Sequence, residues 1–200
     1  MVRRVLYVHG INTSAAELEL QGLAVSRAVS SLATGWATDS VPWGSTGRLL
    51  GDIKMLGATG GIRNISTVNK AVLGADLIIA HSMGSAIIER CHGARDTPVL
   101  HLGSPVPHPI LGRLINLVAP EPRKVRTGHA VDRDVWNADD PVTNHWLLGR
   151  NHDLWHVPYR PVSTRTALPA YRPIYEHSIF VYLQQPRAIE VLTEMLEAAG

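Results

Sequence analysis

The hydrophobic pattern of the chain predicts short buried strands separated by amphipathic helices. Three short runs are apolar on both faces apart from His101 in the third, which is typical of strands in a parallel sheet that is covered on both sides. These runs are Val5–Val8, Leu77–Ala80 and Val99–Leu102. Weaker strand patterns lie near Trp36–Val41, Asp134–Asn137 and Leu154–Tyr159.

Between these strands the apolar residues recur with the period of a helix. The longest such segment is Ala15–Ala33, where Ser14 and Glu17 form a capping-box pattern at the start. Further helices are predicted near Ile65–Leu73, Ser82–Cys91, Leu111–Val118 and Pro186–Ala198. Strands that alternate with helices at this spacing predict an α/β fold. We expect a three-layer α/β/α sandwich with a mostly parallel central sheet of about five or six strands.

The length of the chain, 200 residues, is that of one domain, so we expect a single domain over residues 1–200. An irregular insertion around residues 143–175 breaks the alternation and is rich in proline, arginine and aromatic residues. Long irregular segments in a compact domain often form lids or binding walls. Surface padding is an equally good interpretation of any one stretch of this insertion.

Composition and charge exclude several classes of protein. Hydrophobic residues make up 45% of the chain and charged residues 18%, which is not the composition of a disordered chain. The formal net charge is +2 and the basic residues form no stripe, so we expect no nucleic-acid partner. Cys91 is the single cysteine, which excludes a disulfide framework and a cysteine-based zinc site.

The chain carries no sequence pattern for membrane insertion or export. No run reaches the roughly 18 apolar residues of a membrane span, so we expect no integral membrane segment. The first residues lead directly into the run Val5–Val8 without the pattern of a signal peptide. We therefore expect a soluble, cytoplasmic protein.

The strongest chemical signal surrounds Ser82, where a buried strand gives way to an apolar helix. A serine at such a strand–turn–helix junction is typical of a nucleophile elbow. The residues two positions away on either side, Ala80 and Gly84, are small, as the tight turn requires. The Met83 N–H would then point to the place where a carbonyl oxygen becomes an oxyanion. The alternative is that Ser82 only caps the helix that follows.

A second turn follows the first strand at the same expected edge of the sheet. Gly10 allows the chain to turn tightly there, and the Ile11 N–H is a candidate second oxyanion donor. The alternative is an ordinary strand–helix turn. The sequence after His9 lacks the spaced glycines of a dinucleotide site, and no Walker motif occurs, so we expect no cofactor.

A serine nucleophile needs a base, and the base needs an orienting acid. The order nucleophile, acid, base along the chain predicts an acid after a late strand and a histidine before the last helix. Asp140 fits the first position, with Asp139 as its alternative, and His177 fits the second. Rival histidines in the irregular insertion are His145, His152 and His156.

A metal site at His152 and His156 is the main competing use of these histidines. The two residues are four positions apart and Asp153 lies between them. The segment lacks a helical pattern that would bring both rings to one face, and no third ligand is evident, so we expect no metal. The other histidines are interpreted as structural or surface residues, although His9 and His81 would flank the working groups.

Together these motifs resemble those of serine hydrolases with the α/β-hydrolase fold, most of all small lipase- and esterase-like members. The segments that carry the resemblance, in chain order, are His9-Gly10, Ala80-His81-Ser82-Met83-Gly84, Asp140-Pro141-Val142 and His177-Ser178. The family usually has glycine where this chain has Ala80. It also has two antiparallel strands before the first strand found here, so the resemblance implies a trimmed version of the fold.

The resemblance implies a function as well as a fold. Ser82 would be the nucleophile, His177 the base and Asp140 its orienting acid, while Ile11 and Met83 would supply the oxyanion amides. We expect hydrolysis of a small-molecule or lipid-like carboxylic ester through an acyl-enzyme. The alternatives are acyl transfer by the same residues and an inactive binding module. Candidates for an apolar acyl pocket are Trp43, Met55, Leu56, Leu111, Leu114 and residues 146–155.

Overall fold

Six parallel strands form one sheet in the part of the chain that the structure describes. The structure is a computed structural model, and it describes residues 2–11, 13–45, 62–94, 96–104, 132–137, 140, 156–159 and 177–200. The order of strands across the sheet is β2-β1-β3-β4-β5-β6, and every neighbouring pair is parallel. The strands are β1 (Arg3–Val8), β2 (Trp36–Val41), β3 (Leu77–His81), β4 (Val99–Leu102), β5 (Arg133–Asn137) and β6 (His156–Tyr159).

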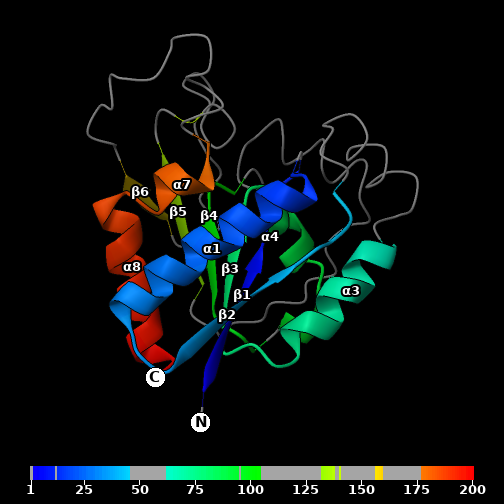
Figure 1. The fold of residues 1–200 in the computed structure, drawn as a ribbon, viewed down its shortest axis with the longest axis horizontal. Helices are drawn as coiled ribbons and strands as arrows, with labels where there is room; N and C mark the ends of the chain where they lie inside the picture. The colour runs from blue at the N-terminus through cyan, green and yellow to red at the C-terminus, as the bar shows by residue number, and fades with distance from the viewer. Residues whose placement is uncertain are drawn as a thin grey trace.

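Helices cover both faces of this sheet, as Figure 1 shows. On one face lie α1, α7 and α8, and on the other lie α3 and α4. The helices are α1 (Ala15–Leu32), α3 (Ile62–Val72), α4 (Met83–Ile88), α7 (Ile179–Tyr182) and α8 (Pro186–Ala198), with a short 3₁₀ helix at His92–Ala94. The predicted three-layer α/β/α sandwich is therefore confirmed.

Alternation along the strands divides the core into two layers. In β3, Leu77 and Ile79 pack with residues of α1, α7 and α8, whereas Ile78 and Ala80 pack with residues of α3 and α4. Successive side chains of a strand point to opposite faces, so a strand that is buried on both sides needs an unbroken apolar run. This requirement explains why β3 was one of the three clear strand patterns in the sequence.

Local signals set the start of the longest helix, α1. The Ser14 hydroxyl accepts a hydrogen bond from the Glu17 N–H at 3.3 Å, and the Glu17 carboxylate accepts one from the Ser14 N–H at 2.7 Å. These two bonds satisfy amides that have no partner within the helix. The Glu17 carboxylate accepts from both the N–H and the hydroxyl of Ser14, and these bonds lower the pKa of Glu17. The predicted capping box is confirmed.

One helical prediction needs correction, and one helix was not predicted. The helix after Ser82 ends at Ile88 rather than at Cys91, because the chain tightens there: the Arg90 N–H bonds to the Ile87 carbonyl and the Cys91 N–H to the Ile88 carbonyl. Helix α7 was not predicted, since four residues are too few to show a helical period. The predicted helix at Leu111–Val118 lies outside the described residues, as does the 143–175 insertion apart from β6.

The order of the strands reverses between β1 and β3. From β1 the chain moves outward to β2, then returns to β3 on the other side of β1. Val8 of β1 is in register with Ala80 of β3, so the two strands reach the same edge of the sheet together. In open α/β sheets, ligands bind beyond the carboxyl ends of the strands at which the order reverses.

Candidate active site

Ser82 occupies a strained turn between β3 and α4. Its φ of 54° and ψ of −125° make it the one non-glycine residue with positive φ among those described. It stands at the N-cap position of α4, yet its side chain makes no capping hydrogen bond. The alternative that this serine serves only as a helix cap is therefore wrong. Strain of this kind persists where the surrounding structure enforces it, often at functional sites.

The turn can form because Gly84 lets α4 pack closely on the end of β1. A Cβ atom at Gly84 would lie 2.3 Å from the Val8 carbonyl oxygen and 2.8 Å from that of His9. Both contacts are with backbone, which cannot move aside cheaply. A glycine is consequently required at this position, where the sequence pattern around Ser82 predicted a small residue.

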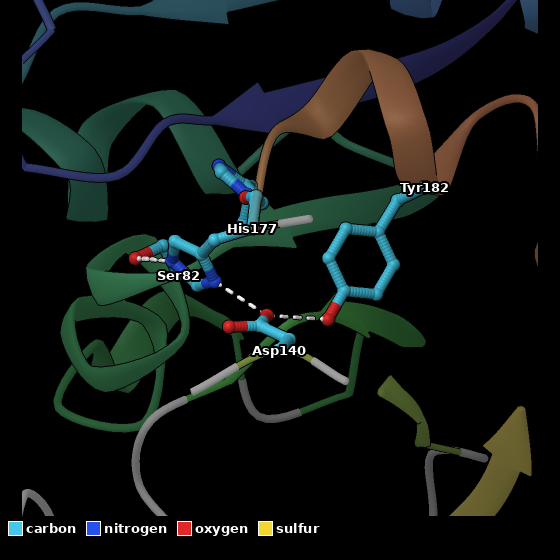
Figure 2. Close-up of polar contacts among 5 residues, drawn as sticks. Ser82, Asp140, His177 and Tyr182 are labelled. Carbon is cyan, nitrogen blue, oxygen red and sulfur yellow. Dashed lines mark hydrogen bonds and ion pairs between the residues drawn. The ribbon is translucent and has the colours of Figure 1, made fainter. Parts of the chain in front are cut away.

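Three predicted side chains come together at this edge of the sheet, as Figure 2 shows. The Ser82 Oγ lies 2.7 Å from His177 Nε2, and His177 Nδ1 lies 2.6 Å from Asp140 Oδ2. A carboxylate can only accept a hydrogen bond, so in neutral His177 the proton belongs on Nδ1. Nε2 then accepts the hydrogen bond that the Ser82 hydroxyl donates.

Tyr182 of α7 also contacts Asp140. Its hydroxyl donates a hydrogen bond to Asp140 Oδ2 over 2.8 Å, so this oxygen accepts from both Tyr182 and His177. Asp140 is fully buried, and a buried carboxylate requires such donors. Sequence reasoning missed Tyr182, although Ser178 gave a signal: its hydroxyl caps α7 by accepting a hydrogen bond from the Phe180 N–H.

His81, the last residue of β3, is packed between the same groups. Its ring lies 5.1 Å from the ring of His177 and 6.2 Å from that of Tyr182. The His81 Nε2–H donates a hydrogen bond of 2.8 Å to the backbone carbonyl of His177. Burial, followed by the charge of His177, lowers the pKa of His81 to about 3, so the ring is neutral near pH 7.

The turn after β1 lies directly against Ser82. A Cβ atom at Gly10 would be 2.8 Å from Ser82 Cβ and 3.2 Å from Ser82 Oγ. The Gly10 carbonyl accepts hydrogen bonds from His9 Nδ1–H at 2.7 Å and from the Thr13 hydroxyl at 3.2 Å. The buried Trp43 stacks on His9 and donates its Nε1–H to the His9 carbonyl at 2.7 Å.

The remaining predicted residues divide into placed and undescribed groups. Ile11 follows Gly10 in the turn and is half-buried, and Met83 is the first residue of α4, so its amide lies in the first helical turn. His156 lies in β6, but its side chain is not described. Outside the described residues lie Asp139, His145, His152, Asp153 and the pocket candidates Met55, Leu56, Leu111, Leu114 and residues 146–155.

The described part of the chain has neither a metal-binding cluster nor a membrane-spanning helix. Within it, no three His, Cys, Asp or Glu side chains are grouped so that they could hold a metal ion. None of the helices described in it is both long and apolar enough to cross a membrane.

The comparisons with known proteins identify structural rather than sequence relatives. No protein-family model matches the sequence, and no curated protein matches it. A structure from Xanthomonas campestris pv. campestris, provisionally named a hydrolase of the alpha/beta superfamily, is 15% identical, with a TM-score of 0.58 over 98% of this chain and 99% of the other. The esterase domain of a Rhodothermus marinus protein is also 15% identical, with a TM-score of 0.43 over 98% of this chain and 85% of the other.

The likeness to the Xanthomonas structure spans nearly the whole of both chains. Together with the parallel sheet and the helices on both its faces, it shows that this chain has the fold of the alpha/beta hydrolases. At 15% identity the likeness is one of fold. The activity has to be argued from the site itself.

Proposed function

We propose that the protein is a serine hydrolase that cleaves carboxylic esters through an acyl-enzyme, with Ser82, His177 and Asp140 as its catalytic residues. The observation that carries the proposal is the hydrogen-bonded chain from Ser82 Oγ through the His177 ring to Asp140. The Xanthomonas neighbour's provisional name, a hydrolase of the alpha/beta superfamily, agrees with this activity.

The first half of the reaction forms the acyl-enzyme. Ser82 Oγ attacks the ester carbonyl carbon while His177 Nε2 takes the hydroxyl proton. The resulting imidazolium is stabilised by the Asp140 carboxylate, which the Tyr182 hydroxyl also holds in place. When the tetrahedral intermediate collapses, the bond to the alcohol breaks and His177 returns the proton to the departing alkoxide.

The second half releases the acid. His177 Nε2 removes a proton from a water molecule, and the hydroxide attacks the acyl carbon. The bond to Ser82 Oγ then breaks, and the serine recovers its proton from His177. No cofactor or metal enters either half.

Backbone amides would stabilise the negative charge that develops on the carbonyl oxygen. We assign this role to the N–H groups of Ile11 and Met83. Support comes from the close contact of Gly10 with the Ser82 side chain and from the start of α4 at Met83. Each donor of this kind contributes about 3 kcal/mol to lowering the barrier.

A fluorophosphonate probe tests the nucleophile directly. We expect the wild-type protein to be labelled and Ser82→Ala to remain unlabelled, because the probe reacts with an activated serine hydroxyl. Ser85→Ala is the matched control: Ser85 lies three residues further on, is buried, and donates its hydroxyl to the Ala80 carbonyl. This control variant should be labelled like the wild type.

Hydrolysis of p-nitrophenyl esters of increasing acyl length tests the reaction and the size of the acyl group. We expect wild-type turnover to depend on Ser82, with about a 10⁶-fold loss of kcat in Ser82→Ala. A wild-type protein that neither reacts with the probe nor hydrolyses p-nitrophenyl acetate would instead indicate a binding module. Labelling without hydrolysis, with product formed only when an alcohol or amine acceptor is added, would indicate acyl transfer.

A further inference from the structure

His81 and Ser82 are consecutive residues, yet they contact two different parts of His177. Ser82 turns out of the sheet and meets the imidazole through its hydroxyl. His81 follows the alternation of β3, so its side chain lies on the same face as Leu77 and Ile79, where α7 packs. From there its Nε2–H reaches the His177 backbone carbonyl.

Within the described residues, the position of His177 depends on contacts that are distant in sequence. Its ring is held by Ser82 and Asp140, which are 95 and 37 positions away. The hydrogen bond from His81 spans 96 positions and holds the backbone from which that ring projects. The ring can reach both partners only if this backbone stays in place.

We propose that His81 is a positioning residue for the ester hydrolysis proposed above, its Nε2–H fixing the His177 backbone so that the imidazole meets Ser82 and Asp140 together. The inference rests on the proposed function. His81 touches neither the nucleophile nor the carboxylate through this bond, so it acts through His177.

The charge state of His81 suits this role. The ring is 6% exposed, and the low pKa that burial causes keeps it neutral. His177 becomes positively charged when it takes the serine proton, and its ring centre is 5.1 Å from that of His81. A neutral donor can hold the His177 backbone without opposing that charge, whereas a lysine or arginine would oppose it.

The other ring nitrogen of His81 favours a specific function over simple packing. Nδ1 is buried and has no hydrogen-bond partner among the residues that the structure places. A buried acceptor without a partner is costly, and an apolar side chain would avoid that cost. A histidine is therefore better explained by what its Nε2–H does than by filling space.

Two nearly isosteric variants separate the hydrogen bond from the volume of the side chain. In His81→Gln the side-chain amide can still donate to the His177 carbonyl, whereas His81→Met fills similar space without a donor. We expect His81→Met to lower kcat for p-nitrophenyl acetate about 100-fold, with KM changed less than about 3-fold. His81→Gln should retain kcat within about 5-fold of the wild type.

Proton NMR of the His177 ring gives a readout that does not depend on activity. The Nδ1–H that bonds to Asp140 should give a protected downfield signal in the wild type and in His81→Gln. This signal is assigned by its loss in Asp140→Ala. In His81→Met we expect it to broaden or disappear through exchange with water. If the wild-type protein proves inactive, the proposed function fails, while the NMR comparison still tests the positioning of His177.

Several outcomes would overturn the proposal. Equal losses of kcat in the two variants would show that the volume or aromatic ring of His81 matters, not its donor. Wild-type kcat and an intact signal in His81→Met would show that the hydrogen bond is dispensable. Circular dichroism checks that both variants fold. If His81→Met does not fold, His81→Gln decides alone: retained kcat supports the proposal and an about 100-fold loss overturns it.

Discussion

The turns that follow β1 and β3 have similar sequences but are held in different ways. Each has a buried histidine, then a small residue, then an apolar one: His9-Gly10-Ile11 and His81-Ser82-Met83. In the first turn the Gly10 carbonyl is held from nearby, by hydrogen bonds from His9 and Thr13, while Trp43 bonds to the His9 carbonyl from 34 positions away. In the second, both the serine hydroxyl and the histidine ring bond to His177.

This difference matches the parts of the two turns that we expect to be used. A turn that supplies a backbone amide must hold one peptide group steady, which neighbouring side chains can do. A turn that supplies a nucleophile must meet a base, and the proposed base, His177, lies 95 positions further along the chain. Glycine suits the first turn also because a side chain there would collide with Ser82.

Among substitutions that test this difference between the turns, the largest expected effect is at Asp140, which meets Ser82 through His177. In Asp140→Asn the side-chain amide presents a donor to His177 Nδ1, which favours the wrong tautomer, and kcat should fall about 10⁴-fold. Asp76→Asn is a control at the other edge of the sheet, where Asp76 accepts a hydrogen bond from the Arg4 N–H. It should leave kcat unchanged. A greater loss in Asp139→Asn than in Asp140→Asn would contradict the assignment of the acid.

In the first turn, we expect kcat to be sensitive to a side chain added at Gly10. In Gly10→Ala the new methyl group would press on Ser82 Cβ and Oγ, so we expect kcat to fall about 100-fold through displacement of the nucleophile. Steady-state kinetics with p-nitrophenyl acetate measure the loss. Gly74→Ala is the control, because its methyl group would meet only the end of the Arg4 side chain. Equal kcat in the two variants would argue against close contact between the turns.

Tyr182→Phe tests how much the proposed activity at the second turn depends on the hydrogen bond from Tyr182 to Asp140. Loss of the hydroxyl leaves Asp140 Oδ2 with one fewer donor, and kcat should fall about 10-fold, the equivalent of roughly 1.4 kcal/mol. Tyr7→Phe is the matched control, since the buried Tyr7 hydroxyl donates to Gln21 on the same side of the sheet. It should lower stability without lowering kcat. Similar kcat losses in both variants would indicate a general packing effect.

The last expected effect concerns stability against pH rather than activity. His81 has a pKa of about 3 when folded and an ordinary value near 6.5 when unfolded, so the unfolded chain binds more protons between these values. Burial of the neutral His81 ring therefore makes its full contribution to the free energy of unfolding above about pH 6.5. This contribution is lost as the pH falls toward 3, by at most about 1.4 kcal/mol per pH unit. Urea unfolding at pH 7, 6, 5 and 4 should show a shallower decline in His81→Gln. Equal slopes in both proteins would contradict the burial of a neutral His81.

Much of the fold was predictable because local sequence decides it. The apolar run of β3, the capping box at Ser14 and Glu17, and the small residue at Gly84 each act within a few positions. The class of fold followed from the alternation of strands and helices. The position of Ser82 in a strained turn also followed, because the turn itself limits which residues can surround it.

The contacts that complete the site were harder to predict because they join residues distant in sequence. Tyr182 meets Asp140 across 42 positions, from a helix too short to show a period. The bond from His81 to the His177 carbonyl depends on how α7 docks against the end of β3. Asp140 and His177 were chosen from their order along the chain, and the structure brings both to Ser82. Their catalytic role stays a prediction.

The separation of Ser82 from His177 along the chain gives the proposed reaction a use in the study of folding. The serine and its turn belong to the middle of the sequence, but the hydrogen bond to the base forms only after the C-terminal segment has docked. An intermediate with β3 and α4 formed and α7 undocked would carry the hydroxyl without its base. The rate of fluorophosphonate labelling during refolding would therefore time the last long-range step of assembly, independently of the secondary structure that circular dichroism records.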